Sequence, residues 1–122
     1  MALDIQLKIY MPEKLVLDTK VYRVVLPAKN MPLTVIKGRA PTLMALSMGL
    51  LQILDESNHV ADEWFISVGS ADIKEDTCTI LTESAFNKKD LNLELVRQMY
   101  EDFKNPYYKW LLDYFENEKN KK

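Results

Sequence analysis

Cysteine and histidine are nearly absent from this sequence of 122 residues, which contains only Cys78 and His59. A single cysteine cannot form an internal disulfide, and a single histidine leaves little from which to build a zinc site or a histidine-based triad. These absences exclude most metalloenzymes and hydrolases. We expect Cys78 to be a small hydrophobic residue within a strand, and His59 to lie on the surface in a hairpin loop.

Long apolar runs are also missing. No stretch approaches the roughly 20 consecutive apolar residues that a membrane-spanning helix needs. The start, Met1-Ala2-Leu3-Asp4, lacks the basic head and long apolar segment of a secretory signal. The sequence therefore predicts a soluble, unexported protein.

Glycine is scarce, and basic residues are not in excess. Gly38, Gly49 and Gly69 do not form a phosphate-binding loop of the Walker or dinucleotide type. The formal net charge is −2, without the clustered Lys and Arg that are typical of nucleic-acid binding. Paired carboxylates such as Asp62-Glu63 fall at predicted turns or strand ends, where solvent keeps them from working as an acid–base pair. We therefore expect neither an enzyme nor a resident metal or cofactor.

Up to about Ala85 the apolar residues recur with a period of two, which places alternate side chains on one face of a sheet. The clearest case is the segment from Leu3 to Ile9, in which Asp4, Gln6 and Lys8 alternate with aliphatic residues. Turn-forming segments separate further strands, and no convincing helix lies between them. This pattern predicts an antiparallel β-sandwich or flattened barrel over residues 1–87. The other expected strands are residues 21–26, 50–54, 64–68 and 77–82.

From Lys88 the apolar period changes to about 3.6, which predicts an antiparallel two-helix hairpin over residues 88–122. Asp90 is expected to cap the first helix, and Asn105-Pro106 to end it. The apolar stripes of the two helices should meet each other or the sheet. The first stripe comprises Leu91, Leu95, Val96, Met99, Tyr100 and Phe103, and the second comprises Tyr107, Trp110, Leu111, Tyr114 and Phe115.

The connection from Asn30 to Pro41 is the most unusual part of the predicted sandwich. It contains Pro32 and Pro41, the cations Lys37 and Arg39, and a methionine that we expect to be exposed. Long connections on a rigid scaffold often present binding residues. From composition alone, a plain structural loop shaped by its prolines explains the segment equally well.

Six short segments, in the same order and with the same spacing, carry a resemblance to a known family. One is Gly38-Arg39-Ala40-Pro41-Thr42-Leu43-Met44-Ala45-Leu46. The others are residues 7–14, 21–27, 49–53, 65–71 and 79–85. Together they resemble the epsilon subunit of rotary F-type ATP synthases, which is called delta in mitochondria.

The resemblance implies a β-sandwich followed by two antiparallel helices, which agrees with the fold predicted from the apolar periods. It implies a subunit without chemistry of its own, at the foot of the central stalk, that joins the gamma subunit to the ring of c subunits. Such a subunit is peripheral at the cytoplasmic face of a membrane, in a bacterium the inner membrane. The alternative is a stand-alone β-sandwich binding module or a diverged paralogue.

The resemblance also implies where the ring of c subunits is contacted. In the family, the loop matching residues 30–41 lies near the polar loops of the ring, which places Asn30, Pro32, Lys37 and Arg39 on that side. Two cations facing polar or acidic loops would assist docking. The family loop is commonly richer in glycine, so we expect a differently shaped loop here.

Some bacterial members bind ATP through a short motif in the first C-terminal helix, which Leu93-Glu94-Leu95-Val96-Arg97-Gln98 resembles. Glu94 and Arg97 are then the candidate ATP contacts. A different alignment places Leu95 at the arginine position. Alternatively, Glu94 and Arg97 form an ion pair on a solvated helix face, worth a few tenths of a kcal/mol.

The second predicted helix is short and strongly aromatic, unlike the longer basic helices of inhibitory family members. Residues 88–122 would extend at most about 50 Å even if wholly helical. The resemblance leaves contacts of this segment with the alpha and beta subunits open, and we expect its inhibition of ATP hydrolysis to be weak or absent.

Overall fold

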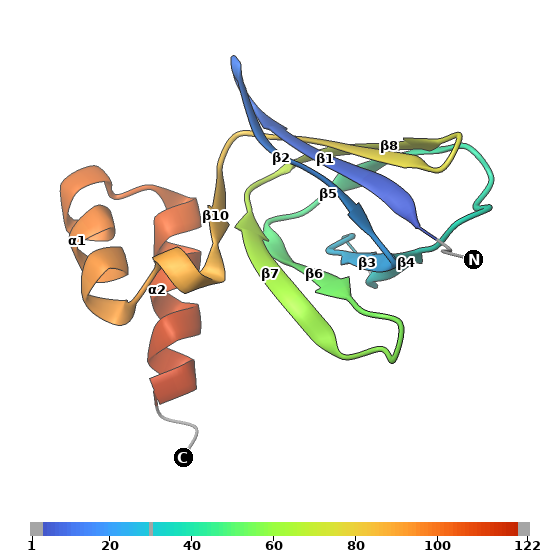
Figure 1. Ribbon diagram of the computed structural model, residues 1–122. Helices are drawn as coiled ribbons and strands as arrows, with labels where there is room; N and C mark the ends of the chain where they lie inside the picture. Colours follow the sequence, from blue (N-terminus) through green and yellow to red (C-terminus); the bar gives the residue numbers. More distant parts are fainter. Residues whose placement is uncertain (1–3, 30, 120–122) are drawn as a thin grey trace.

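The computed structural model describes residues 4–29 and 31–119. These residues form a two-layered sandwich of strands with two helices beside it (Figure 1). The strands are β1 (Ile5–Met11), β2 (Lys14–Val21), β3 (Arg23–Leu26), β4 (Leu33–Val35), β5 (Thr42–Leu46), β6 (Gly49–Leu54), β7 (Val60–Ile66), β8 (Gly69–Lys74), β9 (Thr77–Thr82) and β10 (Ala85–Asn87). A short 3-10 helix, η1 (Lys88–Asp90), leads into α1 (Leu93–Phe103) and α2 (Pro106–Lys119).

The strands form two five-stranded sheets. Sheet A has the order β2-β1-β9-β8-β5, and sheet B has the order β10-β7-β6-β3-β4. The two sheets enclose one apolar core, so the predicted sandwich is confirmed. Its fully buried side chains include Leu7, Ile9, Val24, Leu26, Leu51, Ile66 and Ile80.

Strand β1 shows how the period of two builds this core. Ile5, Leu7 and Ile9 are buried, whereas Gln6 and Lys8 lie on the outer face of sheet A. The alternation places one full set of aliphatic side chains between the sheets. A register slip of one residue would expose that set, so the pattern also fixes the register.

The pairing in sheet A differs from the predicted antiparallel pattern at one place. β1 pairs with β9 in parallel, and the other strand pairs of sheet A are antiparallel. Residues 21–26 are also not one strand. Val21 ends β2 in sheet A and Arg23 begins β3 in sheet B, so the chain passes between the sheets at Tyr22.

Several strands lie outside the predicted segments, namely most of β2 and all of β4, β5, β8 and β10. The register between β1 and β2 shifts at a bulge between Ile9 and Tyr10, which breaks the alternation of Leu15, Val16 and Leu17. β4 lies within the connection that we predicted as a loop, where it pairs with β3.

The predicted cap of the first helix was wrong. Asp90 ends the 3-10 helix, and Asn92 caps α1 because its side-chain oxygen accepts a hydrogen bond from the Leu95 amide at 2.9 Å. α1 ends at Phe103, and Lys104 takes the left-handed conformation. Asn105 then accepts a hydrogen bond from the Tyr107 amide, and Pro106 is the first residue of α2.

The two helices pack on the outer face of sheet B, at the β7 and β10 side of the sandwich (Figure 1). The second apolar cluster of the molecule therefore joins helices and sheet. The predicted stripe of α1 is buried only in part, because Leu95 and Phe103 are 43% and 70% exposed. The buried members of this cluster are Phe65, Leu91, Val96, Tyr107, Leu111 and Leu112.

Candidate functional site

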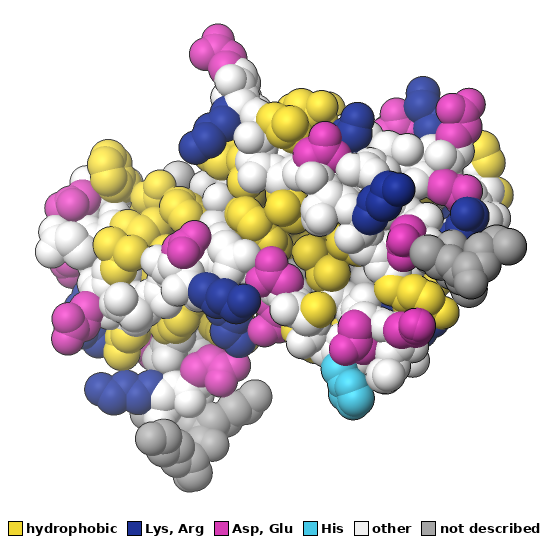
Figure 2. All heavy atoms as spheres, in the orientation of Figure 1, with side chains coloured by type: hydrophobic (Ala, Val, Ile, Leu, Met, Phe, Trp, Pro, Cys, Tyr) yellow, Lys and Arg dark blue, Asp and Glu magenta, His cyan; other side chains and the backbone are white. Residues whose placement is uncertain are grey.

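An apolar groove of about 870 Å³ lies at one end of sheet A. It lies between the β1–β2 turn, the start of β8 and the end of β9. Leu15, Val68 and Leu81 line it and are 47%, 51% and 52% exposed. In Figure 2, apolar side chains reach the surface next to the projecting β1–β2 turn and over the helices.

The strand register explains why apolar side chains face outward here. Leu81 lies opposite Tyr10 of β1 and Ser70 of β8 on the outer face, because its neighbours Ile80 and Thr82 point into the core. The β1–β2 bulge turns Leu15 to the same side, opposite Tyr10. Sequence reasoning missed this groove. The sequence feature that could have revealed the groove was Leu81, an aliphatic residue at a position that the alternation of this strand places on the outer face.

Gly69 is required at the floor of the groove. A Cβ atom at this position would lie 1.9 Å from the carbonyl oxygen of Leu81. Strands β8 and β9 could not approach each other in this way with any other residue at position 69.

The opposite end of sheet A carries a basic turn, Ile36–Arg39. The Arg39 amide donates to the Ile36 carbonyl at 3.3 Å, and Gly38 has a φ of +86°, which together fit a type II turn. The Gly38 amide donates to the carboxylate of Asp76 at 2.8 Å. Lys37 and Arg39 are exposed on this turn.

The structure thus brings two of the predicted ring-side residues together. Pro32 is exposed just before β4, and Lys37 and Arg39 follow that strand. Asn30 lies outside the described residues.

The groove and the basic turn lie at opposite ends of the same strands. The carboxylate of Asp76 holds the basic turn, and the backbone carbonyl of Asp76 accepts a hydrogen bond from the backbone amide of Gln6 near the start of β1. Tyr10, which lines the groove, lies near the end of that strand. Four residues of extended chain separate these two positions by about 13 Å. A rigid sheet therefore connects the two surfaces (Figure 1).

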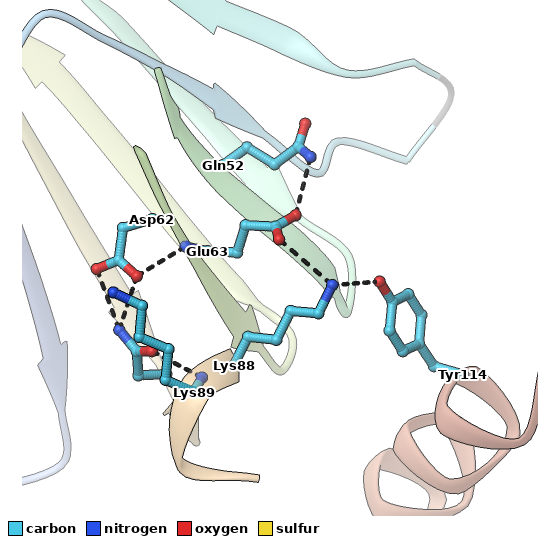
Figure 3. Close-up of polar contacts among 7 residues, drawn as sticks. Gln52, Asp62, Glu63, Lys88, Lys89 and Tyr114 are labelled. Carbon is cyan, nitrogen blue, oxygen red and sulfur yellow. Dashed lines mark hydrogen bonds and ion pairs between the residues drawn. The ribbon is translucent and has the colours of Figure 1, made fainter. Parts of the chain in front are cut away.

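A polar network fixes the helices to sheet B (Figure 3). The Lys88 ammonium contacts Glu63 Oε1 at 3.3 Å and the Tyr114 hydroxyl oxygen at 3.1 Å. Burial opposes the charge of Lys88, but the hydrogen bonds and charges of Tyr114 and Glu63 outweigh burial and raise the pKa of Lys88. Beside it, the Asn87 amide donates to both carboxylate oxygens of Asp62 at 3.0 and 3.1 Å.

The two candidate ATP contacts lie on the exposed side of α1. Arg97 pairs across the hairpin with Glu116 of α2, with Nη2 and Oε2 3.8 Å apart. The expected ion pair between Glu94 and Arg97 is thus replaced by a contact between helices. Lys109, a cation on the neighbouring helix, pairs with Asp113 at 2.9 Å. Both of these exposed cations therefore have a carboxylate partner.

Comparison with known proteins identifies the family. The family described as "ATP synthase, Delta/Epsilon chain, beta-sandwich domain" matches residues 4–88. This chain belongs to the ATP synthase delta/epsilon chain family. The resemblance found in the sequence is confirmed.

Relatives named ATP synthase epsilon chain align with most of this family member. The protein of Rhizobium rhizogenes is 35% identical over 100 residues, which cover 81% of this chain and 73% of the relative. The protein of Rhizobium etli is 30% identical over 122 residues, which cover 94% of this chain and 90% of the relative. The second alignment extends beyond the sandwich into the helices.

Two solved structures share the fold of this delta/epsilon chain. A chain in the mitochondrial ATP synthase of Euglena gracilis, solved as OSCP/F1/c-ring, superposes with a TM-score of 0.68 at 21% identity. The match covers 84% of this chain and spans 64% of that chain. A chain in the central stalk and c-ring of the Tetrahymena thermophila mitochondrial enzyme gives 0.57 at 19% identity, covering 70% and 67%.

The remaining reactive groups of this delta/epsilon chain lie where the sequence predicted them. The His59 side chain is 82% exposed, 4.0 Å from Asp55. Cys78 is buried in the core, which raises the pKa of its thiol to about 12. Among the described residues, no three His, Cys, Asp or Glu side chains gather as a metal site would require. No helix within 4–29 and 31–119 is long and apolar enough to cross a membrane.

Proposed function

We propose that this chain is a non-catalytic rotor subunit in the central stalk of an F-type ATP synthase. It couples the gamma subunit to the ring of c subunits, so that ion flow drives ATP synthesis. One observation carries this proposal: 94% of the chain aligns with 90% of a relative named ATP synthase epsilon chain.

The geometry supports a subunit that holds two partners at once. The groove around Leu81 offers the apolar centre that a stable interface needs, and we assign it to gamma. The hairpin covers part of the outer face of sheet B, which leaves sheet A as the open face. We assign Asn30, Pro32, Lys37 and Arg39 to the polar contact with the ring.

The chain has two functional parts in this proposal, residues 1–87 and 88–122. The first part binds both partners, and the second regulates ATP hydrolysis weakly through contacts with alpha or beta. An ATP molecule at Glu94 and Arg97 would have to displace Glu116 from Arg97, an exposed ion pair worth less than about 1 kcal/mol. The chain is peripheral at the cytoplasmic face of the membrane, attached through the ring, and has no active site of its own.

A pull-down from detergent-solubilised membranes tests the proposal. A tagged full-length chain should co-purify with gamma and c subunits. Leu81→Glu should lose gamma, whereas Val60→Glu, at a position 48% exposed outside the groove, should keep it. A stand-alone binding module predicts recovery of a monomer without either subunit, and that result would refute the proposal.

A further inference from the structure

The β8–β9 hairpin turn adopts an unusual backbone conformation. Its two central residues, Glu75 and Asp76, have φ angles of 50° and 58°. Positive φ at both positions is typical of a two-residue turn that suits glycine or asparagine. Asp tolerates this conformation better than most residues, because its short side chain can hydrogen-bond locally. Here, however, the Asp76 carboxylate bonds to a distant segment.

Asp76 joins three segments of the chain. Its carboxylate oxygen Oδ1 accepts the Gly38 amide at 2.8 Å, and its backbone carbonyl accepts the Gln6 amide at 2.9 Å. The turn Ile36–Arg39 is thereby tied to the hairpin turn of β8–β9 and to the start of β1. A hydrogen bond to a charged acceptor is stronger than one between neutral groups.

The hydrogen bond between the Asp76 carboxylate and the Gly38 amide holds the corner of the basic turn. The hydrogen bond within the turn does not involve that corner. Within the turn, only the Arg39 amide bonds to the Ile36 carbonyl. Among residues 4–29 and 31–119, the hydrogen-bond partner of the Gly38 amide, at the corner of the turn, is Asp76. Lys37 and Arg39 flank that corner, and Arg39 lines a small hollow together with Asp76.

We propose that Asp76 is a positioning residue for the basic turn, which fixes the directions in which Lys37 and Arg39 project toward an anionic or polar loop of the ring. The identity of that partner rests on the proposed function. Fixing the turn before association lowers the conformational entropy lost on binding. A purely structural role would instead limit the effect of Asp76 to the stability of the hairpin turn.

Three variants distinguish positioning of the basic turn from a purely structural role in the hairpin turn. Asp76→Gly removes the carboxylate but accepts a positive φ, so the hairpin turn should still form. Asp76→Asn keeps an oxygen acceptor and tolerates the left-handed conformation. Glu75→Gly is the matched control, because it relaxes the same turn and leaves the bond to Gly38 intact.

The first readout is hydrogen exchange of the Gly38 amide in the full-length chain. We expect exchange roughly tenfold or more faster in Asp76→Gly, as for loss of a hydrogen bond to a charged group. Glu75→Gly should stay within about threefold of wild type, and Asp76→Asn, whose neutral oxygen accepts a weaker hydrogen bond, should lie between Glu75→Gly and Asp76→Gly. Unchanged exchange in Asp76→Gly would overturn the proposal, whatever the partner is.

The second readout is the attachment of the enzyme head to membranes, with each variant assembled into the complex. Asp76→Gly should weaken attachment in the same direction as Lys37→Glu with Arg39→Glu, and Glu75→Gly should not. If charge reversal weakens attachment and Asp76→Gly does not, the positioning role is wrong although the ring contact stands. If charge reversal has no effect, the ring contact itself is wrong, and the positioning role is refuted with it.

Discussion

The ring of Phe65 in β7 packs edge-on against the ring of Tyr114 in α2, with the ring centroids 5.0 Å apart. Trp110 and Phe115 of the same helix lie 5.8 and 5.5 Å from Phe65. Phe65 is fully buried by these contacts. Phe65 of sheet B thus contacts three aromatic side chains of α2 and is a central anchor of the helical hairpin, and the helices and the sheet share one apolar cluster.

Replacing Phe65 tests this anchor. Phe65→Ala should lower the free energy of unfolding by about 3–5 kcal/mol, because it removes a large buried ring and leaves a cavity. Phe103→Ala, at a position 70% exposed, should change it by less than about 0.5 kcal/mol. Urea denaturation followed by tryptophan fluorescence measures both values. Similar losses in the two variants would show that Phe65 is not the anchor.

The raised pKa of Lys88 predicts how the free energy of unfolding depends on pH. Its pKa is raised in the folded chain, so its stabilising contribution is complete below the ordinary lysine pKa of about 10.4. The contribution is lost as the pH rises through the higher folded pKa. The difference in unfolding free energy between wild type and Lys88→Met should therefore shrink above about pH 10.5. Lys89→Met, whose side chain is exposed, is the control, and a difference that grows with pH would contradict the assignment.

Tyr107 offers a stabilising substitution. Its hydroxyl is buried and has no hydrogen-bond partner among residues 4–29 and 31–119, while its ring stacks against Phe86 and Trp110. Burial raises the pKa of this hydroxyl, which therefore stays protonated. Tyr107→Phe keeps the ring and removes the polar atom, so stability should stay constant or rise by up to about 1.5 kcal/mol. A loss above 1 kcal/mol in thermal unfolding would reveal a partner for the hydroxyl.

Removal of the hairpin tests its weak regulatory role. In the assembled enzyme, deleting residues 88–122 should raise ATP hydrolysis by less than about fivefold, the lower end of typical coupling effects. The firm packing on sheet B disfavours a helix pair that swings out to block the head. Subunit stoichiometry must first show that the shortened chain remains in the complex. A larger rise would make the hairpin an inhibitor.

Much of the sandwich could be predicted because it depends on local patterns. The alternation from Ile5 to Ile9 specifies a half-buried strand, and the segment from Thr77 to Thr82 matches β9. The parallel pairing of β1 with β9 could not be predicted, since nothing local records which distant strand lies alongside. The passage between sheets at Tyr22 was also hidden, because residues 21–26 contain no glycine, proline or other turn residue to mark a break between two strands.

The candidate site was less predictable than the fold. The resemblance placed Lys37 and Arg39 in the exposed connection, and the structure adds the anchor at Asp76, 38 residues away from Gly38. Arg97 was expected to pair within its own helix and instead pairs with Glu116. Such contacts depend on how helices and strands pack together. The periodicity of apolar residues within one element carries no information about that packing.

Ion-driven ATP synthesis in membranes from cells that lack this chain tests its coupling role most directly. If the chain couples gamma to the ring, the head should hydrolyse ATP but support little synthesis, and adding the purified full-length chain should restore synthesis. Val60→Glu should restore it, and Leu81→Glu should not. Full synthesis in the absence of the chain would show that the chain does not couple gamma to the ring, and equal rescue by both variants would show that the groove around Leu81 does not bind gamma.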